Sequence, residues 1–154
     1  YAEAMHLHSE LKAAGLPRSP ATMTPLIRLA GRSRQLRNVD SLWNDMEASG
    51  IEQNHVTYSA YIDAHRRCRN HAGAMAFWKR FKESDPPVGP VTPPLLTTIL
   101  RAAAETGDIA RTEELLSEAV DFKLECVHMN CVLEACKKAS DADAARRVLK
   151  QMIR

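Results

Sequence analysis

The chain has 154 residues, with 21 lysines and arginines against 19 aspartates and glutamates, and a formal net charge of +2. So small a charge excludes a polyanion-binding surface over the whole molecule, and any nucleic-acid contact must therefore be local. No apolar run approaches the roughly 18 to 20 residues that a membrane span needs. Aromatic residues make up only 5% of the chain, and Ala, Leu, Arg, Glu and Lys dominate, which indicates a helical fold with an aliphatic core.

The first third of the chain predicts three helices separated by turns. Residues 1–14 place apolar side chains three and four positions apart, as in an amphipathic helix, and Gly15 ends that helix. The same spacing predicts a helix over about 21–33 and another over 36–49, which Gly50 closes. One structural unit is therefore a pair of helices joined by a short turn.

The rest of the chain repeats this arrangement. Residues 58–62 belong to the first helix of the next pair, and residues 75–81 belong to the second. Residues 85–90, Asp-Pro-Pro-Val-Gly-Pro, cannot be helical, because proline lacks the amide donor and clashes with the preceding turn. The remaining predicted helices cover 94–105, 108–122, 127–138 and 141–153, with N-caps at Asp108 and at Ser140 and Asp141.

Similar side chains recur along the whole chain at one set of intervals. Two series step by 35, 35, 38 and 33 residues, and a third shares the last three of these steps. Such periods are typical of stacked supersecondary units that cannot bury their apolar faces alone. The members are expected in the core, as are Trp43 and Trp78, which occupy equivalent positions in successive second helices. The series are Leu7, Leu42, Phe77, Leu115 and Val148; Leu11, Met46, Phe81, Ala119 and Met152; and Ile27, Ile62, Leu100 and Leu133.

The cysteines do not predict a disulfide framework or a zinc site. Cys126, Cys131 and Cys136 follow one another at intervals of five, so on a helix each is rotated about 140° from the one before. Structural zinc usually needs paired ligands about two to four residues apart. We therefore expect small buried side chains in a reducing compartment, and neither a metal nor a cofactor.

The nearest approach to a reactive cluster is residues 65–71, His-Arg-Arg-Cys-Arg-Asn-His, at a turn between two helices. A catalytic site needs an oriented base with a partner, and no carboxylate, nucleophile or metal set accompanies this cluster. The His-x-Glu and paired-cysteine motif of zinc deaminases is missing as well. We therefore expect a solvated turn, and a protein that is not an enzyme.

The repeat unit resembles that of the pentatricopeptide repeat family. Residues 56–62, Val-Thr-Tyr-Ser-Ala-Tyr-Ile, are similar to the family's VTYNTLI segment, residues 42–47 to its LFEEM segment, and Gly50-Ile51 to its GI turn. The tetratricopeptide repeat is the nearest alternative, but its Trp, Gly, Tyr and Pro pattern does not occur together here. The resemblance implies an all-α fold, an α-solenoid of stacked helix-turn-helix repeats in a right-handed superhelix.

This register divides a single helical-repeat domain, 1–154, into five parts. The chain starts inside a helix and stops before a final turn, so we expect a fragment of a longer protein, with any targeting segment outside it. The expected parts are the second helix of a truncated repeat (1–19), three repeats (20–54, 55–92 and 93–125) and an incomplete last repeat (126–154).

The resemblance implies binding of single-stranded RNA, one base per repeat. The family selects each base with the fifth and the last residue of a repeat and sandwiches it with the second. Thr24 with Asn54 is similar to the family's adenine-preferring pairs, whereas the third repeat departs from the pattern at Pro94-Leu95-Leu96. The implied base-selecting residues are Thr24, Asn54, Ser59, Thr92, Thr97, Glu125 and Asn130, and the sandwiching residues are Ala21, Val56, Pro94 and Val127.

The family also carries basic side chains near the phosphates, farther along the same helices. Such a row would supply affinity that does not depend on base sequence. Ordinary surface charge at helix C-termini, which the helix dipole favours, is the alternative interpretation. The residues concerned are Arg32, Arg66, Arg67, Lys137 and Lys138, and Glu105 interrupts the row in the third repeat.

The resemblance thus implies an RNA-binding protein of a mitochondrion or chloroplast that acts in RNA processing, stability or translation. The alternative is a scaffold subunit that binds protein or rRNA within a large organellar complex, such as a mitochondrial ribosome or a plastid membrane complex. Divergent base-selecting pairs favour the alternative. A single groove that holds the basic row together with Thr24, Ser59 and Asn130 would favour RNA.

Overall fold

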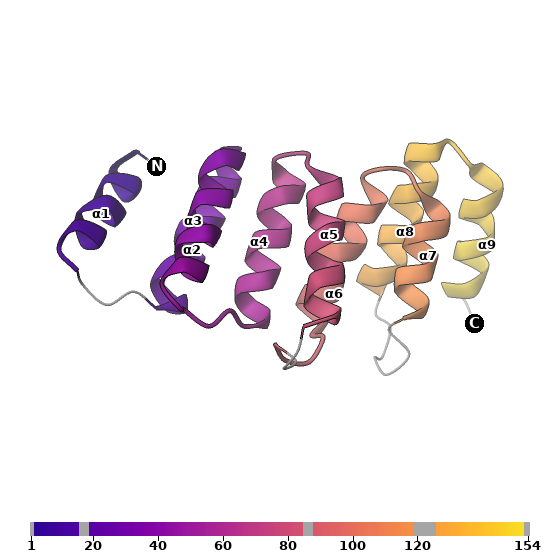
Figure 1. Cartoon of the computed structure of the whole chain (residues 1–154). Coiled ribbons are helices and arrows are strands. Elements are labelled where there is room, and N and C mark those ends of the chain that lie inside the picture. The colour runs from indigo at the N-terminus through magenta and orange to yellow at the C-terminus, as the bar shows by residue number, and fades with distance from the viewer. Residues whose placement is uncertain (1, 16–18, 85–87, 119–125, 153–154) are drawn as a thin grey trace.

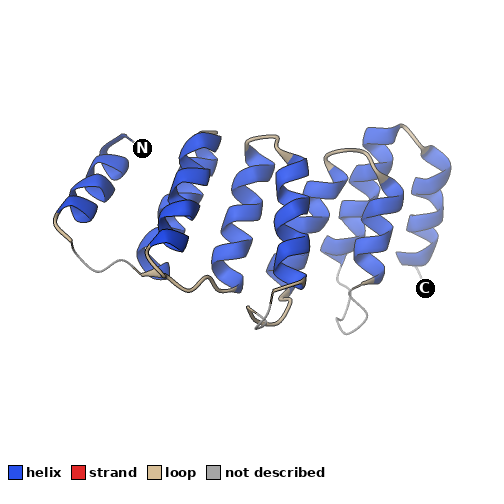
Figure 2. Cartoon of the chain, viewed as in Figure 1, coloured by secondary structure: helices blue, strands red, loops and turns tan. Residues whose placement is uncertain are grey.

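The computed structural model describes residues 2–15, 19–84, 88–118 and 126–152, and within these ranges the chain forms nine helices and no strand (Figure 2). All of the predicted helices are present, but the one predicted over 108–122 ends at Ser117, and residues 119–122 lie outside the described ranges. The helices are α1 (Ala2–Ala13), α2 (Pro20–Arg32), α3 (Leu36–Ala48), α4 (His55–Arg67), α5 (His71–Lys82), α6 (Pro93–Ala104), α7 (Ile109–Ser117), α8 (Cys126–Ala139) and α9 (Ala142–Met152).

The helices stack in chain order into a solenoid, with the two termini at opposite ends (Figure 1). The first helices of successive pairs, α2, α4, α6 and α8, form one row in which each contacts the next. The second helices pack onto this row, α3 against α2 and α4, α5 against α4 and α6, and α7 against α6 and α8. Equivalent positions of neighbouring pairs therefore recur along one line, which is what a repeating binding surface requires.

The core follows the recurring series predicted from the sequence. Ile27, Ile62 and Leu100 are fully buried in the row of first helices, and Leu42 and Leu115 are buried in the second helices. Side chains at three-and-four spacing on each helix thus meet the neighbouring helices, as expected for an amphipathic array. The predicted core positions Leu7, Leu11 and Ala119 lie outside the side chains that the structure describes.

Three described members of the series are less buried than predicted, and one of them is Met152 at the end of α9. Leu133 is only partly buried, because α8 is the last first helix in the described chain and no further helix covers its outer side. Phe77 is also only partly buried. Its ring packs against Trp43 and Tyr61, at centroid distances of 5.1 and 4.2 Å, while the Arg80 guanidinium covers it at 5.7 Å.

The row of first helices is closely packed where α2 crosses α4. A Cβ atom added to Gly31 would lie 2.6 Å from the Ala64 Cα, so only glycine allows the two backbones to approach this closely.

Two of the three residues predicted to cap the second helices do so. The Oδ1 atoms of Asp108 and Asp141 accept hydrogen bonds from the backbone amides of Arg111 and Ala144, respectively. Ser140, predicted to share the capping role, instead adopts a left-handed conformation with φ 57°.

All four cysteines carry free thiols, with Cys131 and Cys136 buried and Cys126 exposed. No group of three or more His, Cys, Asp or Glu side chains among the described residues is arranged to hold a metal ion. None of the helices described is long and apolar enough to cross a membrane.

Candidate functional site

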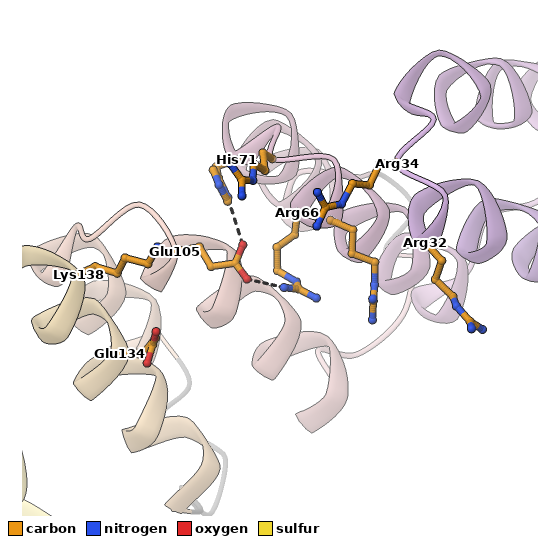
Figure 3. Close-up of a pocket in the computed structure, with 9 residues that line it drawn as sticks. Arg32, Arg34, Arg66, His71, Glu105, Glu134 and Lys138 are labelled. Atoms are coloured by element: carbon orange, nitrogen blue, oxygen red, sulfur yellow. Dashed lines mark hydrogen bonds and ion pairs between the residues drawn. The ribbon is translucent and has the colours of Figure 1, made fainter.

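A polar trough of about 660 Å³ runs along the C-terminal ends of the first helices (Figure 3). It lies where α2, α4, α6 and α8 end, so it crosses the boundaries between successive helix pairs. Six of its side chains are basic and two are carboxylates, although the whole chain carries a net charge of only +2. The lining residues are Arg32, Arg34, Arg66, Arg67, Arg69, His71, Glu105, Glu134 and Lys138.

Ion pairs occupy the middle of the trough. Arg66 donates to Asp63, at 2.7 Å between Nη2 and Oδ1, and also pairs with Glu105 of the next helix pair. Arg67 donates through Nε to the other Asp63 oxygen at 2.6 Å. The His71 ring lies 4.0 Å from Glu105 Oε2, and Arg66 pairs with the other oxygen of this carboxylate (Figure 3). A ligand anion must therefore compete with two carboxylates for Arg66.

These pairs shift the pKa values of both partners. Burial by itself would raise the pKa of Asp63, but the hydrogen bonds from Arg67 and Arg66 outweigh burial and hold the pKa below its ordinary value. Burial likewise opposes the charge of Arg66, and the bonds to Asp63 and Glu105 outweigh it and raise the pKa of the guanidinium. Both groups are charged at neutral pH, so the pairs persist there.

The two ends of the trough hold cations of a different kind. Arg32, Arg34, Arg69 and Lys138 form no ion pair with any carboxylate among the described residues. All four are exposed. They are therefore available to an external anion without first breaking an internal salt bridge, unlike Arg66.

The trough contains most of the predicted phosphate-contacting row. Arg32, Arg66, Arg67 and Lys138 line it together, and Glu105 stands in the row as expected from the sequence. Lys137 does not line the trough. Its ammonium group lies 3.2 Å from Glu134 Oε1, and the residue borders a separate apolar hollow between α8 and α9.

The fifth-position residues differ in exposure, and two of them contact the next helix pair. Thr24 is buried, and its Oγ1 lies 3.3 Å from Thr57 Oγ1. Thr97 Oγ1 lies 3.2 Å from His128 Nε2 and also donates to the Pro93 carbonyl. Ser59 is half-buried, whereas Asn130 is exposed. None of the four lines the trough, because they lie near the opposite ends of the same helices. The trough is therefore not the single groove, shared by the basic row with Thr24, Ser59 and Asn130, that the sequence led us to look for.

The last-position residues serve as helix N-caps. Asn54 Oδ1 accepts hydrogen bonds from the amides of Val56 and Thr57, each at 3.0 Å, and Thr92 Oγ1 accepts from the Leu95 amide. Capping accounts for the short polar side chains that precede α4 and α6. Glu125 lies outside the described residues.

The second-position residues remain accessible along the start of the first helices. Val56 is 41% exposed, which is unusual for a large aliphatic side chain in this chain. Ala21 and Pro94 are exposed and Val127 is half-buried. An exposed apolar row is compatible with stacking against a flat ligand, and its backbone positions precede those of the basic row by about 16 Å of helix rise.

Sequence reasoning missed two features of this region. The cluster at 65–71 is not simply a solvated turn, because His65 is buried and lies 3.1 Å from Asp40. Its position three residues after Ile62 on the core face of α4 was the available signal. Arg34 and Arg69 were also missed, although the density of arginine just after α2 and α4 pointed to those turns.

The family model of the PPR repeat matches residues 21–51, 56–85 and 127–154, which together make up more than half of the chain. The chain belongs to the pentatricopeptide repeat family. The matched segments leave out residues 86–126, which include α6 and α7, where the sequence departs from the family pattern at Pro94-Leu95-Leu96. No curated protein sequence gives a significant match to the chain.

Solved structures of this family share the fold. The maize pentatricopeptide repeat protein PPR10 aligns with a TM-score of 0.81 and 17% identity over 95% of this chain, which spans 21% of that protein. PPR10 has also been solved in complex with an 18-nt psaJ RNA element. The PPR domain of Arabidopsis thaliana protein-only RNase P 1, in complex with tRNA, aligns with a TM-score of 0.79 and 16% identity over 99% of this chain and 82% of that one.

Proposed function

We propose that this pentatricopeptide repeat chain binds single-stranded RNA, with the phosphates along the basic trough and the bases toward the exposed second-position residues. The observation that carries the proposal is the alignment of Arg32, Arg67 and Lys138 in one trough across three boundaries between helix pairs. Equivalent positions on the first, second and fourth helix pairs thus carry cations that can contact the negative charge of a phosphate chain, while Glu105 occupies the third. The two solved relatives that carry RNA in their complexes support the same assignment.

We further propose the finer roles that the family implies. Ala21, Val56, Pro94 and Val127 sandwich bases, and Ser59 and Asn130 select them, since these two remain accessible. Thr24 and Thr97 contribute less to selection, because each hydroxyl already contacts the next helix pair. The cellular role that fits is RNA processing, stability or translation in a mitochondrion or chloroplast, with binding rather than catalysis as the activity.

The free energy of base stacking alone does not suffice for tight binding, so the trough contributes to affinity. About four stacked bases at about 1 to 3 kcal/mol each contribute about 4 to 12 kcal/mol, from which association costs of several kcal/mol are subtracted. Base contacts alone therefore give weak binding at the lower end of this range. The phosphate contacts then decide whether the complex is stable at physiological salt.

The proposal is tested by crosslinking the full-length protein in cells and sequencing the bound RNA, combined with binding of the purified protein at several salt concentrations. The test variant replaces Arg32, Arg67 and Lys138 with glutamine and is compared with the unchanged protein. We expect the slope of log affinity against log salt to fall by about 2, because each lost phosphate contact on a single strand removes about 0.7. Recovery of protein partners without RNA would contradict the proposal.

A scaffold function is the second candidate, and two observations favour it. The hydroxyls of Thr24 and Thr97 are committed to contacts between helix pairs, and Glu105 interrupts the cations in the trough. A surface of this kind fits an acidic segment of a partner protein. Copurification of a stoichiometric protein that protects Arg32 and Lys138 from chemical modification would establish this function instead.

A further inference from the structure

The turns after α2 and α4 place arginine where the backbone disfavours any side chain. Arg34 has φ 54° and Arg69 has φ 59°, both in the left-handed region. In each turn this residue donates its amide to the carbonyl three residues earlier, Gly31 and Arg66 respectively, at 3.0 and 2.9 Å. These are helix C-terminal motifs in which glycine is strongly preferred. Left-handed backbone is strained for residues with a Cβ atom.

The fold itself does not require arginine there. The equivalent turn after α6 has Gly107, with φ 80°, and the turn after α8 has Ser140, with φ 57°. The four turns therefore share the left-handed conformation and differ in the side chain. Strained residues kept against backbone preference are typical of functional sites.

Arg34 and Arg69 both project into the trough already described. Neither forms an ion pair with a carboxylate in the described part of the chain, and both are exposed. Figure 3 shows the Arg34 side chain directed from its turn toward Arg66. Arg32 and Arg67 lie two residues before them at the ends of α2 and α4. Two arginine pairs thus occur at equivalent positions of neighbouring helix pairs.

We propose that Arg34 with Arg32, and Arg69 with Arg67, form two phosphate clamps that bind consecutive phosphates of an RNA strand. The inference rests on the proposed function and adds the two turn arginines to the binding surface. Guanidinium groups donate paired hydrogen bonds to phosphate oxygens, which suits a clamp of two arginines. Arg67 pairs with Asp63 through Nε, so its two terminal amino groups are not needed for that pair and can donate to a phosphate.

The clamps also set the extent of the phosphate track. After the α4–α5 turn the trough continues to Glu105 and Glu134, and the equivalent turn residue is Gly107. Carboxylates repel phosphates, so the phosphates lie close to the trough at the first two turns and are held away from it at Glu105. Lys138 then provides a separate contact beyond the carboxylates.

The test replaces the two arginines with glycine, Arg34→Gly and Arg69→Gly together, in the complete chain. Glycine is the residue that this backbone prefers, so we expect a melting temperature equal to or above that of the unchanged protein. The probe is a fluorescein-labelled 16-nucleotide oligouridylate, titrated by anisotropy at several KCl concentrations. We expect the salt slope to fall by about 1.4, which corresponds to roughly tenfold weaker binding at physiological salt.

Two controls separate the clamps from strain and from net charge. Ser140→Gly relieves the same backbone conformation without removing a charge, and we expect it to leave the RNA affinity unchanged. The double variant Lys79→Gln and Arg146→Gln removes two charges that lie outside the trough, and we expect less than a twofold change in affinity.

The outcomes distinguish this inference from the function on which it rests. If the unchanged protein binds the oligouridylate and the double glycine variant binds it equally well, the clamps are wrong and the proposed function stands. If the double glycine variant loses no more affinity than the Lys79→Gln and Arg146→Gln control, the clamps are likewise wrong and the proposed function stands. If the unchanged protein does not bind the probe at any salt concentration, both proposals fail.

Discussion

The Arg66 guanidinium of α4 forms an ion pair with the Glu105 carboxylate at the end of α6, across the boundary between two helix pairs. The side chains are 15% and 33% exposed, so the pair lies partly buried in the wall of the trough. Glu105 stands where the other helix pairs have Arg32, Arg67 and Lys138. At this position the trough therefore has a carboxylate that neutralises Arg66, whereas the equivalent positions have cations that a ligand can contact.

Replacing this carboxylate with a cation should strengthen RNA binding. Glu105→Lys frees Arg66 from one partner and restores the row, while Asp63 still holds Arg66 at 2.7 Å. One added phosphate contact raises the salt slope by about 0.7, equivalent to roughly fourfold tighter binding at 0.15 M salt. Anisotropy titration of oligouridylate measures both quantities. Glu113→Lys, the same charge change on the exposed side of α7, should have a much smaller effect.

Reversing the charge of Arg67 should weaken RNA binding without unfolding the protein. Arg67 is 44% exposed, and its bond to Asp63 is a surface ion pair of about 0 to 1 kcal/mol. Asp63 keeps Arg66 as a partner, so the melting temperature of Arg67→Glu should change by only a few degrees. Its affinity for RNA should fall at least fourfold. Lys79→Glu, on α5, is the matched control, and equal affinities of the two variants would remove Arg67 from the binding surface.

The helices and most of the core could be predicted from the sequence, because both depend on local spacing. Ile27, Ile62 and Leu100 recur in one register, and all three are buried. Phe77 shows the limit of this reasoning. Its spacing places it in the core series, but whether Arg80 or another helix covers the ring depends on tertiary packing that periodicity does not contain.

The candidate site was less predictable, because a position in a repeat does not specify which partners a side chain has. Thr24 occupies the same repeat position as Asn130, yet Thr24 is buried against Thr57 and Asn130 is exposed. Likewise Arg66 and Arg32 were assigned one role, but only Arg66 is held by carboxylates from two helices. Pairing across helix boundaries is a property of the stacked array.

The packing around Trp43 predicts a difference between two aromatic truncations. Trp43 is 1% exposed, and its ring lies 4.5 to 5.1 Å from those of Tyr58, Tyr61 and Phe77. Trp43→Ala should therefore lower the free energy of unfolding by about 3 to 5 kcal/mol. Phe77→Ala removes a partly buried ring and should cost less than about 3 kcal/mol. Denaturant unfolding of both variants measures the difference, and equal losses would contradict the assigned burial.

His65 is held as a neutral imidazole by a chain of hydrogen bonds. Asn70 Oδ1 accepts from the Gly73 amide at 3.0 Å, so the Asn70 amino group faces His65 Nδ1 at 3.2 Å. Nδ1 therefore accepts, and Nε2 carries the proton that it donates to Asp40 Oδ1 at 3.1 Å. Tyr61 donates its hydroxyl to the same carboxylate oxygen at 2.6 Å. Protonation of Nδ1 would put two donors face to face.

This arrangement makes the stability of the protein depend on pH near 6. Burial lowers the pKa of His65, and the Asp40 charge and hydrogen bond only partly oppose it. The unfolded chain takes up a proton at about pH 6.5 and the folded chain does not, so stability is full above that pH and decreases as the pH falls toward the folded pKa. Urea unfolding of the unchanged protein should thus give a smaller free energy at pH 5.5 than at pH 7.5. His65→Gln should reduce this difference, whereas His6→Gln, which removes an exposed histidine, should preserve it. A pH dependence unchanged by His65→Gln would show that other groups titrate instead.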